Sequence, residues 1–320
     1  MCILWRSLRS LVVVRAAFLA CAFAVAAHAA SFDCAKAGTR VEKAICADPA
    51  LGRLDEEIAA AWRAAGADLD EPMRQRLVRS QREWLKGRRP PPDLAPALRQ
   101  RLAQLRATRV TLSDVDLLRL AGDSRPMYVL GTAPGAAAYN QWVDGVWKAD
   151  ADDTSPRDAD AAQEKCIAQA PAGQQGDCME ESETHAYETI VPAPGIVSVT
   201  ERVVIDQHAA HPIDEVHHHH WWLSRSGRIT VADVFVGNGY RAVIAKAVKR
   251  FVQRDGGTAS QAAIDEVSDP DAWSIGADAL TLTGDGYTFE HGRGKLEIVV
   301  PWREFGGALR AEFGAALRQR

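Results

Sequence analysis

The chain has 320 residues and a formal net charge of −4 at neutral pH. This mildly acidic balance disfavours partners that carry negative charge, such as nucleic acid or an anionic membrane surface, and favours a basic protein partner. Because single domains are usually about 100–150 residues long, we expect more than one domain.

The first 29 residues have the features of a secretory signal peptide. Three arginines accompany an apolar run from Leu11 to Ala27 that contains no acidic residue, and Ala27-His28-Ala29 has the small-x-small cleavage pattern. We expect residues 1–29 to be removed, which changes the net charge to about −7. The mature protein is then periplasmic or secreted, with no stable membrane span. A retained membrane anchor and lipidation at Cys21 are the alternatives.

Four cysteines remain after this cleavage: Cys34, Cys46, Cys166 and Cys178. In an oxidising compartment an even number suggests disulfides, and four cysteines allow three pairings. We favour Cys34–Cys46 and Cys166–Cys178, because each closes a short loop and such a closure stabilises by about 3 kcal/mol. A four-cysteine zinc site is the rival interpretation, but the usual C-x-x-C spacing is missing.

Residues 30–110 have the pattern of a small all-α domain. Thr39-x-x-Glu42 is a capping box that opens a first helix, and Asp48-Pro49 opens a second. Two further helices follow, separated by Pro90-Pro91-Pro92. Each long helix has an apolar stripe, so we expect the helices to pack on one another. The stripes are Leu51, Leu54, Ile58, Trp62 and Ala65, then Met73, Leu77, Trp84 and Leu85, then Leu98, Leu102 and Leu105.

Residues 111–320 show short strand patterns separated by Gly, Pro and Asp. Two helical patterns, 240–253 and 305–317, interrupt them, and the acidic stretch 149–163 is expected to be a loop. The predicted fold class is therefore α+β: a helical domain followed by an α+β domain whose antiparallel sheet is packed by helices. The clearest strand patterns are 195–205, 217–223, 279–282, 287–290 and 296–300.

The helical region carries several residues at fixed spacings: Phe32 to Ala37, Thr39, Val41-Glu42-Lys43, Ile45-Cys46, Leu54-Asp55, and Gln81-x-x-Trp84-Leu85 with Arg88. Over roughly residues 32–108 this pattern resembles the LprI-type lysozyme-inhibitor N-terminal domain. That family commonly has two further cysteines, and this chain lacks both. The resemblance therefore implies that Cys34 pairs with Cys46.

The second half carries Asn140, Ala210-His211-Pro212, the run Ser226 to Phe235, and Ile298-Val299-Val300-Pro301-Trp302. Over roughly residues 125–312 these residues resemble the RsiV-type lysozyme-binding domain. The segment from Cys166 to Cys178 is an insertion relative to that family. Ala209-Ala210 stands where the family usually has Gly-Gly, which affects the expected turn.

Both resemblances imply lysozyme, or another muramidase, as the partner. We expect an exported envelope protein that binds lysozyme and inhibits it by occluding the active-site cleft, with His211, Pro212 and Trp222 as partner-binding residues. An envelope-stress sensor or scaffold without inhibitory activity is an alternative. The sequence has no nucleophile elbow, His-Glu-x-x-His pattern or Gly-rich phosphate loop, so no enzyme activity is expected.

The histidine tract 217–220 supports another alternative, a periplasmic metal-binding protein that uses residues 208–220. On a strand His217 and His219 share one face, and with His208 or His211 they could hold zinc, copper or nickel. No other cofactor is expected. Trp221 and Trp222 follow on opposite faces, so we expect one to be core and the other a binding anchor.

Gln81, Trp84 and Arg88 fall at i, i+3 and i+7 on one helix face. They form either a contact surface for a partner or, as we favour, a motif that locks one helix to another, because such tryptophans are often core residues.

Overall fold

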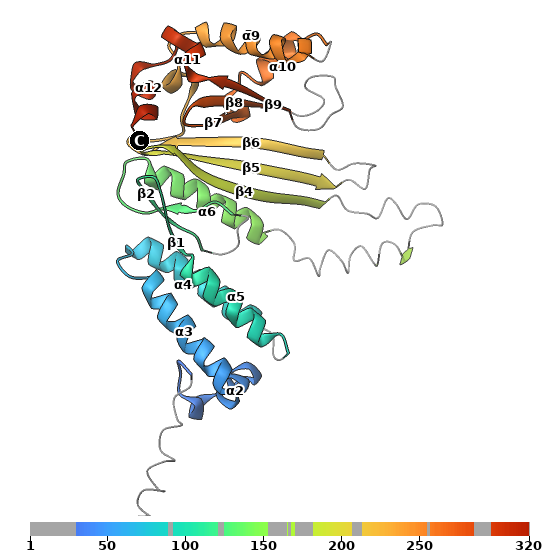
Figure 1. The fold of residues 1–320 in the computed structure, drawn as a ribbon. Helices are drawn as coiled ribbons and strands as arrows, with labels where there is room; N and C mark the ends of the chain where they lie inside the picture. Colours follow the sequence, from blue (N-terminus) through green and yellow to red (C-terminus); the bar gives the residue numbers. More distant parts are fainter. Residues whose placement is uncertain are drawn as a thin grey trace, which may run out of the picture. The chain divides into compact units, whose positions relative to one another are not determined.

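The structure is a computed structural model that describes residues 30–88, 92–120, 125–152, 165, 168–169, 182–206, 213–254, 257–284 and 296–319. The chain divides after Thr108 into two compact units. A helical region is followed by a region of antiparallel sheets and helices (Figure 1), so the predicted α+β class is confirmed. Of the helices described, none is long and apolar enough to cross a membrane. The predicted signal peptide lies outside the described residues.

The N-terminal unit is helical, and local capping positions its elements. Thr39 and Glu42 form the predicted capping box, in which the Glu42 side chain accepts the Thr39 N–H at 2.8 Å. The Asp48 side chain accepts the Ala50 N–H at 2.7 Å, as an N-cap does. The elements are η1 (Cys34–Lys36), α2 (Arg40–Ala47), α3 (Pro49–Ala65), α4 (Glu71–Gly87) and α5 (Leu94–Arg106).

The predicted disulfide between Cys34 and Cys46 is confirmed and joins η1 to the last turn of α2. Replacing both cysteines with alanine should lower the free energy of unfolding of this unit by about 3 kcal/mol, because the unfolded chain gains the entropy of an open loop. Urea unfolding, followed in the N-terminal unit, measures this loss. Reduced wild-type protein is the matched control and should unfold like the variant. Equal urea midpoints for the oxidised wild type and the variant would contradict the expectation.

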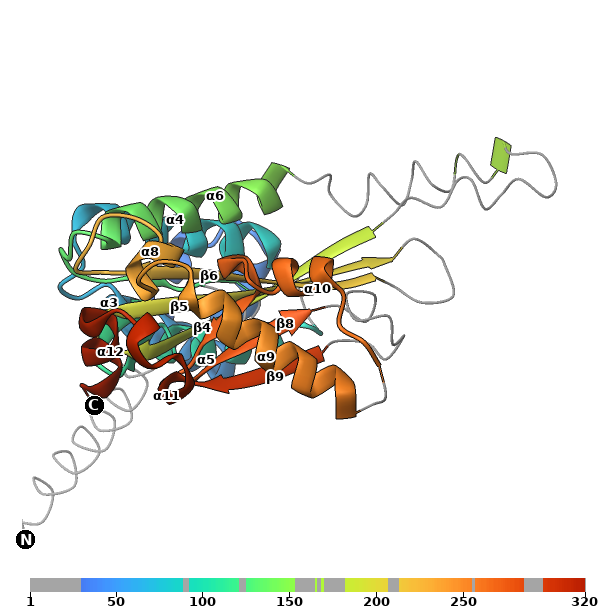
Figure 2. The same cartoon turned by 90° about the horizontal axis from the view of Figure 1, so that it is seen from above.

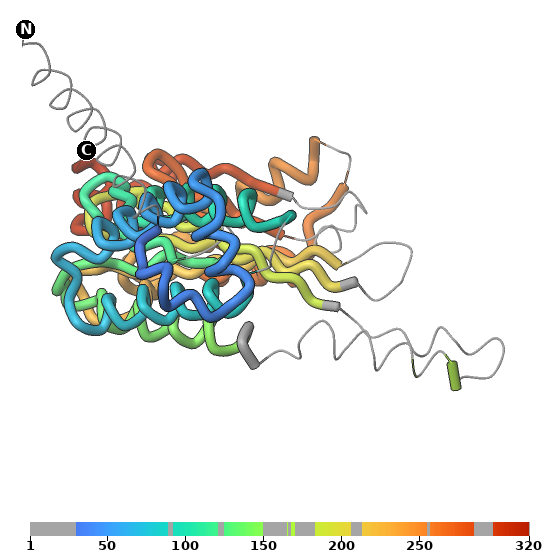
Figure 3. Tube along the Cα trace, turned by 90° about the horizontal axis from the view of Figure 1, so that it is seen from below, coloured from blue at the N-terminus to red at the C-terminus, as the bar shows by residue number. Residues whose placement is uncertain are grey.

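The C-terminal unit contains three antiparallel sheets among the described residues, each of three strands in sequence order. The middle sheet is the largest, and its strands run side by side over ten residues or more (Figures 2 and 3). The strands are β1 (Arg109–Leu112), β2 (Val115–Leu118), β3 (Tyr128–Val129), β4 (Ser182–Ala193), β5 (Ile196–Asp206), β6 (Ile213–Trp222), β7 (Trp273–Ile275), β8 (Ala279–Gly284) and β9 (Leu296–Pro301).

Helices cover these sheets in layers. One face of the β4–β5–β6 sheet packs on α6, where Trp221 meets Tyr139 and Trp142. The other face packs on β7 and β8, and α9 lies beyond them (Figure 1). The helices are α6 (Ala136–Asp152), α8 (Val231–Val234), α9 (Gly239–Arg254), α10 (Gln261–Glu266), η3 (Pro270–Ala272), α11 (Trp302–Phe305), η4 (Gly306–Ala308) and α12 (Ala311–Arg318).

The structure corrects two expected ranges and adds strands that the sequence analysis did not predict. The helix expected over 305–317 is broken into α11, η4 and α12, because Gly306 has φ +49° and ends α11. The loop expected over 149–163 begins as helix, since α6 continues to Asp152. The predicted strands do not include β1, β2, β3, β4 and β7. The strand pattern at 287–290 lies outside the described residues.

Candidate functional site

The histidine tract lies on β6, and its side chains alternate between the two faces of the sheet, as predicted. His217, His219 and Trp221 face the side of α6, whereas His218, His220 and Trp222 face the side of β7 and β8. The two faces hold the histidines in different ways.

On the α6 side the tract contributes to a hydrogen-bond network around Glu201 of β5. Its carboxylate accepts bonds from the Tyr187 hydroxyl at 2.7 Å and from His185 Nδ1 and His219 Nε2, each at 2.8 Å. Burial raises the pKa of Glu201, but the hydrogen bonds from His219, Tyr187 and His185 outweigh this effect and lower the pKa to about 2. Glu201 is therefore an anion on the middle strand that organises three side chains from the two strands beside it.

His219 also contacts Arg228, so both of its ring nitrogens are engaged. Arg228 Nη2 donates to His219 Nδ1 at 2.8 Å and to an Asp271 carboxylate oxygen at 2.9 Å. Because a guanidinium only donates, Nδ1 is the acceptor and Nε2 carries the proton donated to Glu201. A metal bound at His219 would have to displace Arg228 or Glu201.

On the opposite face His218 and His220 are buried between two sheets, each 3% exposed. His220 Nε2 donates to the Trp273 carbonyl at 2.6 Å, and its Nδ1 accepts from the Ser198 hydroxyl at 2.8 Å. His218 lies between the hydroxyls of Thr200 and Thr283, at 3.0 and 3.1 Å. Burial lowers the pKa of His220 to about 3, although the bond to Trp273 opposes this shift.

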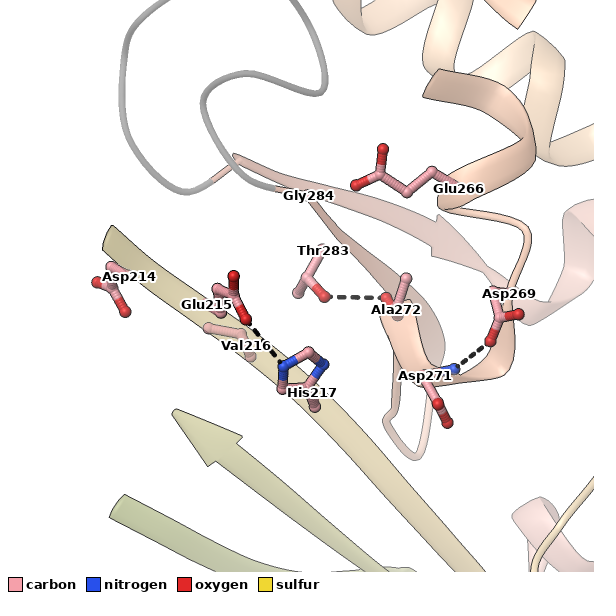
Figure 4. Close-up of a pocket in the computed structure, with 10 residues that line it drawn as sticks. All are labelled: Asp214, Glu215, Val216, His217, Glu266, Asp269, Asp271, Ala272, Thr283 and Gly284. Carbon is pink, nitrogen blue, oxygen red and sulfur yellow. Dashed lines mark hydrogen bonds and ion pairs between the residues drawn. The ribbon is translucent and has the colours of Figure 1, made fainter. Parts of the chain in front are cut away.

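A pocket of about 320 Å³ lies where β6 meets the α10–η3 segment and the end of β8 (Figure 4). Its charged lining is mainly acidic. Arg202 Nε donates to Asp214 at 2.8 Å, and Arg228 faces Asp271, so two of the carboxylates have arginine partners. His217 Nε2 lies 3.4 Å from Glu215 and is 45% exposed. The ten lining residues are Asp214, Glu215, Val216, His217, Glu266, Asp269, Asp271, Ala272, Thr283 and Gly284.

The two tryptophans after the tract are both buried, so at least one is core as expected, and the binding role expected for Trp222 stays a prediction. Trp221 is 1% exposed and Trp222 is 7% exposed. Trp222 packs edge to face on Phe313, with Arg225 4.4 Å above the ring. The Trp222 side chain therefore contributes to the core, and substituting it would affect stability as well as any binding.

Several predicted site residues lie outside the described residues: His208, His211, Pro212, Cys166 and Cys178. Their roles in partner binding, metal binding and a second disulfide stay predictions. Within the described part of the chain, no three His, Cys, Asp or Glu side chains form a group that could hold a metal ion. The metal-binding alternative thus depends on His208 and His211, which lie outside the described residues.

In the N-terminal unit, Gln81 and Trp84 contact Arg101 of α5, and Arg88 lies over the Trp84 ring. Arg101 Nε and Nη2 donate to Gln81 Oε1 at 3.0 and 2.8 Å. The guanidiniums of Arg101 and Arg88 lie 5.6 and 5.3 Å from the Trp84 ring centroid, within cation–π range. This geometry supports the interpretation that the motif locks α4 to α5.

Arg101 itself was not among the predicted site residues, although it is 1% exposed. The signal for it is its position in the apolar stripe of α5, three residues after Leu98 and next to Leu102. A charged residue at such a position needs polar partners, and half-buried Gln81 and buried Ser80 accept its hydrogen bonds.

The helical region of the chain is similar to a known protein family. Residues 33–108 match the family model described as "Lysozyme inhibitor LprI". This match confirms the predicted resemblance of the helical region. No curated protein matches the chain.

Two solved structures from the DUF3298 family are similar to the chain. The first, from Pseudomonas aeruginosa PAO1, is 14% identical with a TM-score of 0.34, and the match covers 42% of this chain and 64% of that one. The second, from Bacteroides fragilis, is 13% identical with a TM-score of 0.37, and covers 60% and 75%. The chain thus spans less than two thirds of the first of these proteins. The resemblance of the C-terminal unit to the RsiV-type domain stays a prediction.

Proposed function

We propose that the protein is an exported lysozyme-binding protein that inhibits its partner by covering the active-site cleft. The observation that carries this proposal is the match of residues 33–108 to the lysozyme-inhibitor family. That match covers the whole run of helices from α2 to α5. It supports a binding function without requiring any catalytic group in this chain.

The construction of the N-terminal unit suits an inhibitor. Inhibition by occlusion requires a surface that keeps its shape in the free protein, because ordering a flexible surface reduces affinity. The Cys34–Cys46 disulfide fixes α2, and the Gln81–Arg101 hydrogen bonds fix α4 against α5. Such a unit can be rigid before the partner arrives.

The charge of the chain supports a basic partner. Removal of the predicted signal peptide leaves a net charge of about −7, which increases the rate of encounter with a basic protein and makes that rate sensitive to salt. Shape complementarity and buried contacts would still supply most of the affinity. Charge alone therefore does not define the partner.

Binding can be tested by interferometry with purified, oxidised mature protein over immobilised c-type, g-type and bacterial muramidases at physiological salt. We expect saturable binding to at least one of them. An unrelated acidic protein of the same net charge is the control, and it should bind weakly and lose that binding as salt rises. If the protein binds no muramidase better than this control does, the proposed function is wrong. Binding without loss of enzyme activity would indicate a sensor instead of an inhibitor.

A further inference from the structure

We propose that the outer edge of β6, where it borders the acidic pocket, accepts an extended basic segment of a partner protein by strand addition. The inference rests on the proposed function, in which the partner is a protein with basic surface segments, and it assigns one contact to the C-terminal unit. It follows from the backbone of β6, from the pocket beside it and from the charge of the pocket lining.

Strand β6 is the last strand of its sheet: within the described residues it pairs in the sheet with β5 alone. The chain already uses the outer edge of β6 for a short strand addition. Ile229 N–H donates to the His220 carbonyl at 2.7 Å, and Trp221 and Arg228 form an isolated antiparallel bridge. This edge therefore accepts extended backbone in the folded protein.

The outward direction of the backbone can be followed along the strand. In an antiparallel pair, the N–H and C=O of a residue point to one side and those of the next residue point to the other. Because the carbonyl of His220 points outward, the backbone groups of Val216 point outward as well, four residues earlier. Those of Glu215 and His217 point to β5, where they pair with Val203 and Glu201.

The pocket lies beside this outward-facing stretch. Asp214 to His217 line one side of it, and Glu266, Asp269 and Asp271 line the other (Figure 4). A segment added along β6 would carry alternate side chains into a cavity of about 320 Å³. An added strand could therefore form main-chain hydrogen bonds with the edge of β6 and place its side chains in the pocket.

The charge of the lining identifies the kind of segment. Five carboxylates surround the cavity. Arg202 and Arg228 contact two of them from its border, and His217 lies 3.4 Å from a third, that of Glu215. Like charges gathered in one pocket repel each other, and a cation brought between them relieves that repulsion. Lysine or arginine side chains at alternate positions of an added strand would provide this positive charge. An acidic or purely apolar segment would not.

The test uses the full mature chain, a fluorescent peptide of alternating lysine and valine, and whichever muramidase binds the wild type. Val216→Pro removes an N–H that points outward and leaves the β5–β6 hydrogen bonds in place, which proline tolerates on edge strands. Glu266→Gln with Asp269→Asn removes two charges from the pocket. Asparagine keeps the cap that Asp269 provides to the Asp271 N–H.

We expect Val216→Pro and the double variant each to weaken peptide binding at least tenfold, and the double variant also to reduce its salt dependence. The matched control is Glu183→Gln with Glu188→Gln, two exposed carboxylates on β4, which should bind the peptide as the wild type does. The melting temperature identifies a variant that fails to fold. If Val216→Pro unfolds, the double variant alone decides the matter.

The outcomes separate this inference from the proposed function. Unchanged peptide and muramidase binding in the folded pocket variants would overturn the inference while leaving a lysozyme inhibitor intact. Peptide binding that is lost in those variants, in a protein that binds no muramidase, would support the inference and refute the proposed function. Equal weakening by the β4 control would show that net charge, and not the pocket, attracts the peptide, and would also overturn the inference.

Discussion

Replacing Arg101 with methionine is expected to lower the free energy of unfolding of the N-terminal unit by about 3 kcal/mol, since hydrogen bonds to a charged group contribute about 1.5–3 kcal/mol and the buried acceptors lose their donor. Arg101 is 1% exposed, and burial lowers its pKa to about 10, so it remains charged at neutral pH. Without its guanidinium, the Gln81 carbonyl oxygen loses both donors, and the Trp84 ring loses a cation–π contact. Methionine restores the packing volume but none of these bonds.

Hydrogen exchange resolved on peptides from residues 71–106 measures this loss without interference from the other unit. Arg99→Met is the matched control, because Arg99 lies on the exposed side of the same helix, and it should change stability by less than about 0.5 kcal/mol. Equal effects of the two substitutions would show that the Gln81–Arg101 contact does not lock α4 to α5.

Acidification from pH 7 to pH 3.5 is expected to destabilise the C-terminal unit by about 5 kcal/mol through His220 and Glu201 together. The pKa of His220 falls from 6.5 in the unfolded chain to about 3 in the fold. The unfolded state therefore binds the proton first, and stability falls as the pH drops below 6.5. The pKa of Glu201 falls from 4.5 to about 2, so its contribution is present above pH 4.5 and is lost as the pH drops through that range.

The two contributions can be separated by pH. Between pH 6.5 and 4.5 His220 acts without Glu201, with a slope of up to about 1.4 kcal/mol for each pH unit. Urea unfolding at several pH values should show this slope in the wild type. His220→Gln keeps a polar side chain between the sheets but cannot take up the proton, so its slope should be smaller in this window. An unchanged slope would mean that other groups cause the acid sensitivity.

The sequence predicted those parts of the structure that depend on local signals. The capping box at Thr39 and Glu42 and the Asp48 cap involve residues at most three apart, and both occur as expected. The alternation along β6 follows from strand geometry alone. The break at Gly306 was missed because the apolar residues on both sides keep a helical spacing, and only the positive φ of the glycine ends the helix.

The site depends on contacts that no local pattern encodes. Glu201 is joined to His185 and His219 across two strand pairings, over separations of 16 and 18 residues. Strand β4 was missed because its polar side chains give little apolar signal, although Tyr187 and Thr189 point inward from it. The pocket brings together β6, α10, η3 and β8, and its acidic character appears only when these elements meet.

The most direct test of the proposed function is a muramidase assay with purified, oxidised mature protein, in which lysis of a peptidoglycan substrate by c-type, g-type and bacterial enzymes is followed at increasing protein concentration. The proposal predicts that one of these enzymes loses activity saturably and completely when the protein reaches stoichiometric amounts. Full activity of every enzyme at a large excess of folded protein would contradict it.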